Sequence, residues 1–384
     1  MRNALVIHTS LSGLGGAEKV SSAIIESLKK MNYYVKLYTM EPTNWKQLIN
    51  VFNIEPKTLP HEYYNLLPFH IRKFTIYTRL IASKIMESKI KRGYDIVINT
   101  HGDALPIATD IVYMHFPGFA AMEYYPHKHR STGSIINKIY LAGYDFLRRH
   151  LTPSFENSTI LCNSSFSRAV IKLKLNIDAQ VVYPPIDIEF FGKAYFRKKG
   201  SEPYNIVSIG RFSPEKNYEF IVEIAKRLRD LKFFIIGSIG NPKNKSYFLK
   251  ILGLKHKYSL SNLILVPNAS HRKLLEILTY SRVLLHTMKY EHFGMAIAEG
   301  MVAGLVPVIH RSGGAYYDII KRDKYGYSYR TIDEAIEKIW EALENYPRIY
   351  GKIHDYASKE FGREEFHIRF KKILDSITNQ DIIV

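Results

Sequence analysis

The feature that most constrains this chain is a series of short apolar runs, each followed by a segment long enough for a helix, which restarts near the middle. Such alternation predicts parallel strands joined by crossover helices. The runs of the first half are 4–8, 34–40, 94–99, 110–115, 158–163 and 181–185. The runs of the second half are 205–210, 233–238, 263–268, 283–287 and 306–310, with helical patterns at 17–31, 218–230, 274–280 and 296–304. We therefore expect an α/β protein with two Rossmann-like, doubly wound domains.

The length and the prolines indicate where the domains divide. A chain of 384 residues is long enough for two domains, each with its own core. The polar, basic stretch from Pro184 to Pro203 is typical of an interdomain linker. We expect the first domain over 1–186 and the second over 187–362, and we hypothesise that the C-terminal segment 363–384 packs back on the first.

Composition restricts the class of protein further. Hydrophobic residues make up 46% of the chain, which is globular, yet there is no uncharged apolar stretch of the roughly 18 residues that a membrane span needs. The N-terminal run MRNALVIHTS reads as a strand and not as a signal peptide. Cys162 is the one cysteine, so disulfides and Cys-based metal sites are excluded. This composition fits a reducing, cytoplasmic compartment.

The formal net charge of +18 indicates an anionic partner: nucleic acid, a membrane surface or a phosphorylated substrate. Between residues 61 and 92, seven Lys and Arg face two acids, a net +5, with aromatic and aliphatic residues interleaved. Such a segment is suited to lie on an anionic membrane, although a solvated helix with a buried face is the alternative. A second basic and aromatic cluster spans 127–150.

Ligands of open α/β sheets bind beyond the carboxyl ends of the strands, so the turns there are the places to search, and we expect them to line one interdomain cleft. The turn after 283–287 leads into Glu291-His-Phe-Gly-Met-Ala-Ile-Ala-Glu299. Phe293 and Gly294 end a loop before a helix, so the backbone N–H groups of Gly294, Met295 and Ala296 could bind an anion or sugar hydroxyls. On spacing alone, a capped helix with two solvated acids is an equal alternative.

Three other strand ends carry candidates. Arg211 and Lys216 follow 205–210, and two cations there could stabilise the charge of a departing diphosphate. Gly15 and Gly16 follow 4–8, where glycine lets the backbone approach a ligand closely. His115 ends 110–115 and is a candidate for sugar positioning, although a lone strand-end histidine is more often structural.

These motifs together resemble the retaining GT-B glycosyltransferases of the family-4 type. The run EHFGMAIAEGMVAGLVPVIHRSGGAYYDII (291–320) is especially similar to the α-1,2-mannosyltransferases that extend the dolichol-linked N-glycan precursor. The stretches G-R-x-x-x-x-K-N at Gly210–Asn217 and G-G-A-E at Gly15–Glu18 also match the family pattern. The resemblance implies that Glu291 contacts the transferred sugar and that Glu299 holds the ribose.

The resemblance also implies the rest of the site and the reaction. Arg211 and Lys216 would clamp the diphosphate, Gly15 and Gly16 would border it, and His115 would lie against the donor sugar. The expected reaction moves a hexose, with mannose from GDP-mannose favoured over UDP-linked hexoses, to a lipid-linked glycan acceptor in protein glycosylation. We expect retention by a same-face route, no metal and no cofactor, and a peripheral position on the cytoplasmic face of a membrane.

Three other functions remain open at this point. A nicotinamide-dependent oxidoreductase has similar domains, but Glu18 stands where the third glycine of a dinucleotide fingerprint belongs. A sugar-nucleotide epimerase of the same fold is a further alternative. A basic nucleic-acid-binding protein would explain the charge, but no helix-turn-helix, aromatic sheet platform or zinc module is legible, so we expect no nucleic-acid partner.

Overall fold

The computed structural model describes residues 2–13, 15–52, 54–71, 75–90, 93–118, 142–144, 146–148, 150–198 and 203–378. The chain divides into two compact units, one of Met1–Pro185 with Glu364–Val384 and the other of Ile186–Arg363. The boundaries expected after residues 186 and 362 each lie one residue from these.

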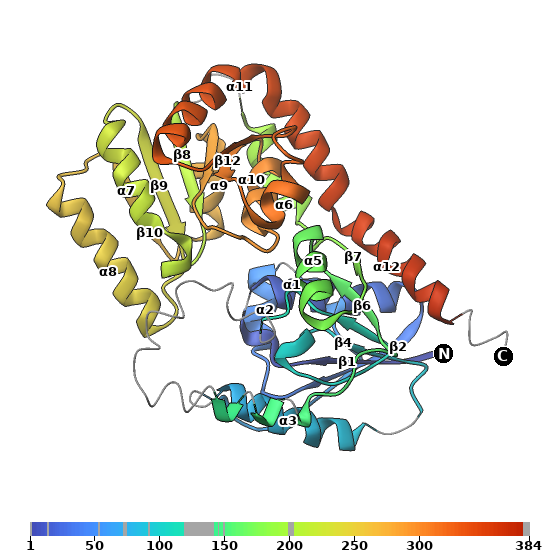
Figure 1. The fold of residues 1–384 in the computed structure, drawn as a ribbon. Helices are drawn as coiled ribbons and strands as arrows, with labels where there is room; N and C mark the ends of the chain where they lie inside the picture. Colours follow the sequence, from blue (N-terminus) through green and yellow to red (C-terminus); the bar gives the residue numbers. More distant parts are fainter. Residues whose placement is uncertain are drawn as a thin grey trace. The chain divides into compact units, whose positions relative to one another are not determined.

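The first unit is built on a parallel sheet of strand order β3-β2-β1-β4-β5-β6-β7 (Figure 1). Its strands are β1 (Arg2–His8), β2 (Tyr33–Thr39), β3 (Glu62–Asn65), β4 (Ile96–Asn99), β5 (Ile111–Tyr113), β6 (Thr159–Cys162) and β7 (Ala179–Val181). Its helices include α1 (Gly16–Lys30), α2 (Trp45–Phe52), α3 (Thr75–Lys89), α5 (Ser165–Leu175) and α12 (Arg363–Thr378).

The core of the first unit explains why these elements form. The run Ala4–Ile7 in β1 is buried along its whole length, as expected for a parallel strand covered on both faces. One stripe of α1 at helical spacing joins this core through Val20, Ile24 and Leu28. A second stripe comes from the far end of the chain, where α12 contributes Phe366, Phe370 and Leu374. The C-terminal helix therefore packs on the first unit.

The second unit has a parallel sheet of order β10-β9-β8-β11-β12-β13. Its strands are β8 (Asn205–Ile209), β9 (Lys232–Gly237), β10 (Leu263–Pro267), β11 (Val283–His286), β12 (Val306–His310) and β13 (Tyr327–Tyr329). Its helices are α6 (Ile188–Phe196), α7 (Tyr218–Arg227), α8 (Pro242–Lys257), α9 (His271–Thr279), α10 (Met295–Val302) and α11 (Ile332–Phe361), and α7 lies along β9 (Figure 1).

Two predictions about the middle of the chain were wrong. The segment expected to be a linker holds α6, because the carboxylate of Asp187 accepts a hydrogen bond from the Phe190 N–H at 3.0 Å and Phe191 is buried. The strand expected at 181–185 instead spans Ala179–Val181. Proline has no N–H to give to a neighbouring strand, so the Pro-Pro pair at 184–185 cannot continue the ladder.

In both sheets the chain order reverses beside the first strand of the unit. β1 lies between β2 and β4, and β8 lies between β9 and β11. Ligands of open α/β sheets bind at such switch points, so each unit presents one place to search. Among the described residues, no helix combines the length and the apolar character needed to cross a bilayer.

Candidate active site

The candidate site of the second unit lies at the switch point between β8 and β11. Lys216 follows β8 in a short 3-10 turn (Pro214–Lys216), and Glu291 follows β11 in the loop that leads to α10. Because the carboxyl ends of the two parallel strands share an edge, these loops meet. Two residues 75 positions apart in the sequence are thereby brought into contact.

One carboxylate oxygen of Glu291, Oε2, lies within hydrogen-bond distance of two donors. Lys216 Nζ lies 2.7 Å from Glu291 Oε2, and His286 Nε2 lies 3.0 Å from the same atom. The side chains of Lys216 and Glu291 are 15% and 14% exposed. The structure therefore brings together two of the residues predicted from the sequence and adds His286 to them.

The electrostatics of this cluster favour an ionised carboxylate. Burial by itself raises the pKa of Glu291, but the charge of Lys216 and the hydrogen bond from His286 outweigh it and lower the pKa well below its usual range. Burial lowers the pKa of His286, so the imidazole is neutral near pH 7. A carboxylate held ionised beside one cation is suited to accept hydrogen bonds from sugar hydroxyls.

The loop that carries Glu291 is held from β12 by the stretch Ser312-Gly313-Gly314. Ser312 Oγ accepts from the Tyr290 N–H at 2.8 Å, and the Gly314 N–H donates to the Glu291 carbonyl oxygen at 2.8 Å. Gly313 has a φ of +71°, in the left-handed region that favours glycine. Ser312–Gly314 therefore positions Glu291, a role that the sequence did not reveal.

The helix N-terminus predicted beside Glu291 is present at α10. Gly294 is its N-cap, with φ +106°, and no side chain caps the helix there. Because the first turn of a helix has no intrahelical acceptors for its N–H groups, Met295 and Ala296 offer donors beside Glu291. Phe293 is buried against Phe361, with ring centroids 5.6 Å apart, and so anchors the loop. Glu299, within the same helix, is buried.

Arg211 differs from Lys216 in its surroundings. Its side chain is 68% exposed, and Nη2 lies 3.4 Å from the Glu215 carboxylate, within the same short loop. Exposure leaves the guanidinium able to turn towards a ligand. The structure therefore places both predicted cations in one loop, where Lys216 pairs with Glu291 and Arg211 pairs with Glu215.

In the first unit, the glycine-rich stretch at the start of α1 donates a backbone hydrogen bond to a carboxylate of the same chain, that of Glu18. Glu18 Oε2 accepts from the Gly15 N–H at 2.8 Å, and Glu18 Oε1 lies 3.9 Å from His8 Nε2. Burial raises the pKa of Glu18, but the hydrogen bond and charge of His8 lower it below the usual value. Gly15 is the N-cap of α1, and Gly16 is its first residue.

The predicted His115 lies at the same edge of that sheet. Its Nε2 is 3.1 Å from the carbonyl oxygen of Thr100, and the Thr100 hydroxyl lies 2.9 Å from His8 Nδ1. His101 Nδ1 lies 3.1 Å from His8 Nε2. Burial lowers the pKa of His101 well below its usual value, so this imidazole is neutral near pH 7. Three histidines therefore lie at or just beyond the carboxyl ends of β1, β4 and β5, beside the switch point of the first unit.

Three functional candidates are not predicted from the sequence: His8, His101 and His286. His8 and His286 are the last residues of β1 and β11, and His101 lies two residues after β4. The rule that ligands bind beyond strand ends could have selected them, but a lone histidine gives no sign of its partner. Within the described ranges, no group of three or more His, Cys, Asp or Glu side chains is arranged to hold a metal ion.

Comparison with protein families places this site in a known class. Residues 193–360 match the family described as Glycosyl transferases group 1, and this range contains Lys216, His286, Glu291 and Glu299. The second unit of this chain therefore carries a glycosyltransferase group 1 domain. The oxidoreductase and nucleic-acid-binding alternatives find no support in this match.

Several curated proteins that are similar to this chain share one name. The chain is 23% identical to a GDP-Man:Man(3)GlcNAc(2)-PP-Dol alpha-1,2-mannosyltransferase of Dictyostelium discoideum over 98% of this chain and 85% of that protein. Proteins of the same name in mouse and Xenopus laevis are 32% and 28% identical over 42% and 56% of this chain. These two alignments span 35% and 48% of the relatives' own length, so the chain covers about half of them or less.

Solved structures show the same fold. Sucrose-phosphate synthase from Thermosynechococcus elongatus superposes with a TM-score of 0.75 at 14% identity, covering 99% of this chain and all of that one. WaaG, a glycosyltransferase of lipopolysaccharide biosynthesis, superposes with a TM-score of 0.67 at 14% identity over 98% of this chain and 99% of that one. The GT-B fold predicted from the sequence is confirmed.

Proposed function

We propose that this chain transfers mannose from GDP-mannose to a lipid-linked oligosaccharide, with retention at the anomeric carbon and without a metal. The observation that carries the proposal is the Lys216–Glu291 pair at the β8/β11 switch point of a group 1 glycosyltransferase domain. The donor and acceptor follow the names of the relatives, which specify GDP-mannose and a dolichyl diphosphate glycan. Glu291 offers a hydroxyl acceptor, and Lys216 offers a cation for the diphosphate.

The role of each group follows from its chemistry. Lys216 and Arg211 neutralise the charge that develops on the diphosphate as the glycosidic bond breaks. Glu291 accepts hydrogen bonds from hydroxyls of the mannose, and the N–H groups of Met295 and Ala296 add neutral donors beside it. Glu299 is proposed to hold the ribose. In the first unit, Gly15, Gly16 and His115 keep the roles that the family resemblance gives them.

Retention is proposed to arise on one face of the sugar. The bond between C1 and the β-phosphate oxygen breaks with its electron pair going to that oxygen, and the acceptor hydroxyl oxygen forms the new bond to C1 from the same side. The acceptor proton passes to the departing phosphate oxygen. A double displacement would need a carboxylate nucleophile, and Glu291, already engaged by Lys216 and His286, is proposed to bind hydroxyls instead.

Metal independence is proposed because two cationic side chains follow β8 where a diphosphate would need neutralising. Lys and Arg can stabilise the leaving diphosphate without a divalent ion. Turnover by the wild type in excess EDTA should then equal turnover in Mg²⁺. Loss of turnover in EDTA, with recovery on adding Mg²⁺ or Mn²⁺, would contradict this part of the proposal.

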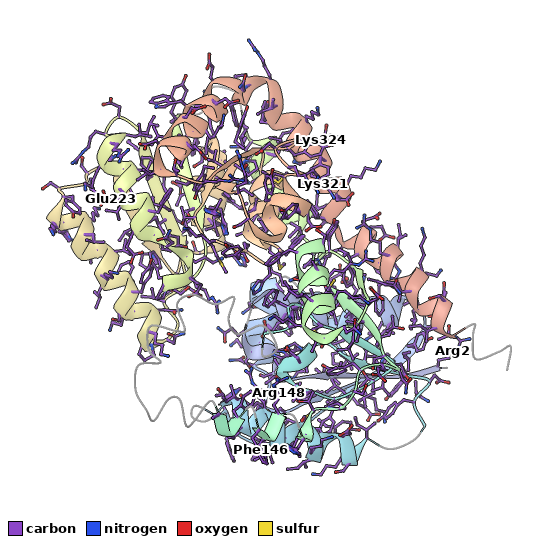
Figure 2. All side chains as sticks on the ribbon, viewed as in Figure 1. Arg2, Phe146, Arg148, Glu223, Lys321 and Lys324 are labelled. Atoms are coloured by element: carbon purple, nitrogen blue, oxygen red, sulfur yellow. The ribbon has the colours of Figure 1, made fainter. Side chains whose placement is uncertain are left out.

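A membrane-facing surface is proposed on the first unit. The described part of the basic segment forms the edge strand β3 and the helix α3, while residues 72–74 and 91–92, like most of 127–150, lie outside the described residues. The exposed apolar side chains of this surface are Tyr63, Tyr64, Phe69, Ile81, Ile85 and Phe146. Phe146 and Arg148 lie beside α3 (Figure 2). Such a surface suits anionic lipid on the cytoplasmic face.

Vesicles test this surface directly. The wild type should sediment with vesicles that contain phosphatidylserine and remain in solution with phosphatidylcholine alone. Replacing Tyr63 and Phe69 by serine should reduce sedimentation, whereas Leu249→Ser, which removes an apolar side chain 52% exposed on α8, should not. Equal sedimentation of all three proteins would contradict the proposal that this surface binds the membrane.

The function itself is tested by transfer of labelled mannose from GDP-mannose to the lipid-linked acceptor Man(3)GlcNAc(2)-PP-Dol. The proposal predicts a mannosylated lipid whose new linkage is α, the configuration of the donor. A β linkage would contradict retention, and transfer from a UDP-hexose alone would contradict the donor. Formation of an epimerised sugar nucleotide without transfer would favour the epimerase alternative.

A further inference from the structure

Two donors share one acceptor atom in the second unit. Lys216 Nζ and His286 Nε2 lie 2.7 Å and 3.0 Å from Glu291 Oε2. Under the proposed function, the diphosphate of the donor is a stronger partner for Lys216 than Glu291 is, because it carries more negative charge. Another group must then keep the carboxylate of Glu291 in place for the sugar.

The two donors differ in their freedom to move. Lys216 reaches Glu291 through a flexible four-carbon stem, and its ammonium also lies 3.5 Å from Met288 Sδ. His286 is the last residue of β11 and its side chain is 3% exposed. The hydroxyl of Tyr329, on β13, donates to the carbonyl oxygen of His286 at 3.0 Å. Lys216 can therefore turn to a ligand, while His286 is fixed.

We propose that His286 is a positioning residue: it holds Glu291 for the transferred sugar while the donor diphosphate draws Lys216 away. This inference rests on the proposed function, because it concerns the bound sugar nucleotide. The role of His286, the last residue of β11, is specified neither by its position at a strand end nor by the match to the family. His286 itself touches neither sugar nor phosphate in this account and acts through Glu291.

The chemistry of the imidazole suits this part. A neutral imidazole with its proton on Nε2 donates one hydrogen bond to Glu291 and leaves the carboxylate its full negative charge. The second oxygen of the carboxylate then accepts from sugar hydroxyls. A second cation at this place would compete with the sugar for the carboxylate, and an apolar residue would leave one oxygen of a buried carboxylate without its donor.

Two substitutions separate positioning from packing. His286→Leu removes the donor and keeps an apolar volume, whereas the amide nitrogen of His286→Gln reaches the place of Nε2 and restores the donor. His256→Leu, at an exposed histidine of α8, is the matched control. Each protein is measured for kcat/KM with GDP-mannose, for the Kd of GDP, which lacks the sugar, and for its thermal midpoint.

We expect His286→Leu to lower kcat/KM about 10- to 100-fold, the range for losing a hydrogen bond to a charged group. The Kd of GDP should not change, and the thermal midpoint should fall only slightly because Lys216 still pairs with Glu291 when no donor is bound. His286→Gln should recover most of the activity. A parallel loss of GDP binding and thermal stability, unrescued by Gln, or an unchanged kcat/KM, would overturn the role of His286. No turnover of any sugar nucleotide by the wild type would overturn the proposed function itself.

Discussion

Gly313 lies so close to Glu291 that a Cβ atom on Gly313 would be 2.8 Å from the backbone nitrogen of Glu291 and closer still to its carbonyl oxygen. Gly313 also has a φ of +71°, a conformation that side chains with a Cβ rarely adopt. The next residue, Gly314, donates to the same carbonyl at 2.8 Å. The position of the candidate catalytic carboxylate therefore depends on a glycine 22 positions further along the chain.

Replacing this glycine should move the loop. Gly313→Ala should destabilise the second unit by about 1–3 kcal/mol, through the unfavourable backbone conformation and the contact with Glu291. It should also lower turnover, because Glu291 shifts. Gly240→Ala is the matched control, since no atom lies within 4 Å of the Cβ it would add. Urea unfolding and GDP-mannose turnover would measure both effects, and wild-type behaviour of Gly313→Ala would contradict this account of the loop.

The Lys216–Glu291 pair should matter for turnover, unlike a surface pair of similar length. Lys216→Met should lower kcat/KM with GDP-mannose about 10²- to 10³-fold, the range for removing one group that stabilises developing charge. It should also weaken GDP binding. Lys226 pairs at 2.8 Å with Glu223, which lies on the surface of α7 (Figure 2). Lys226→Met is therefore the matched control and should leave both values unchanged. Equal effects of the two substitutions would count against the diphosphate role.

The stability of the second unit should fall as the pH falls from about 6.5 to about 4. Burial lowers the pKa of His292 and of His310 to about 4. In this window the unfolded chain binds protons that the folded chain does not, so the free energy of unfolding decreases. Carboxylates change the free energy of unfolding mainly below about pH 4.5, where they take up protons. The upper part of this pH window therefore reports on histidines.

The fluorescence of Trp340 reports on the second unit in a Trp45→Phe background, because the chain has two tryptophans. Urea midpoints at pH 7 and pH 5 should differ in this protein, and His310→Asn should reduce the difference. A midpoint that is the same at both pH values would show that these histidines titrate normally in the folded protein.

In the first unit, Glu18 should stabilise the start of α1. Glu18→Ala removes the acceptor of the Gly15 N–H and should cost about 0.5–2 kcal/mol, the range for losing a helix cap. Glu18→Gln keeps an acceptor and should cost less. Glu26→Ala, in the same helix and paired with Lys30 at 3.2 Å on the surface, is the control. Trp45 fluorescence in a Trp340→Phe background gives the midpoints, and equal values for the three variants would refute the capping role.

The sequence predicts the central strands well because buried parallel strands are continuous apolar runs. β1 and β11 stand out for this reason, whereas β3 and β13, with the short polar sequences Glu62–Asn65 and Tyr327–Tyr329, do not. The sequence predicts a linker in place of α6, because the flanking prolines and lysines obscure the pattern of a capped apolar helix. Local composition alone cannot show which strand an edge segment will join.

The candidate site was predictable only in part. Lys216 and Glu291 follow strands, so their presence at one sheet edge could be inferred, and the structure brings them within 2.7 Å. The contact of one Glu291 oxygen with His286 depends on the path of the loop that follows β11. That path depends in turn on Gly313, in the turn after β12. Such contacts between distant residues leave no periodic pattern in the sequence.

The central claim is that Glu291 holds the sugar of the donor while Lys216 holds its diphosphate, and calorimetry with two ligands tests it most directly. In Glu291→Gln, the ratio of the Kd of GDP-mannose to the Kd of GDP should rise about tenfold or more, since only the sugar loses its charged acceptor. The Kd of GDP itself should not rise, because GDP lacks the sugar that Glu291 holds and Lys216 no longer has to leave a charged partner. An unchanged ratio, or an equal weakening of both ligands, would contradict the assignment.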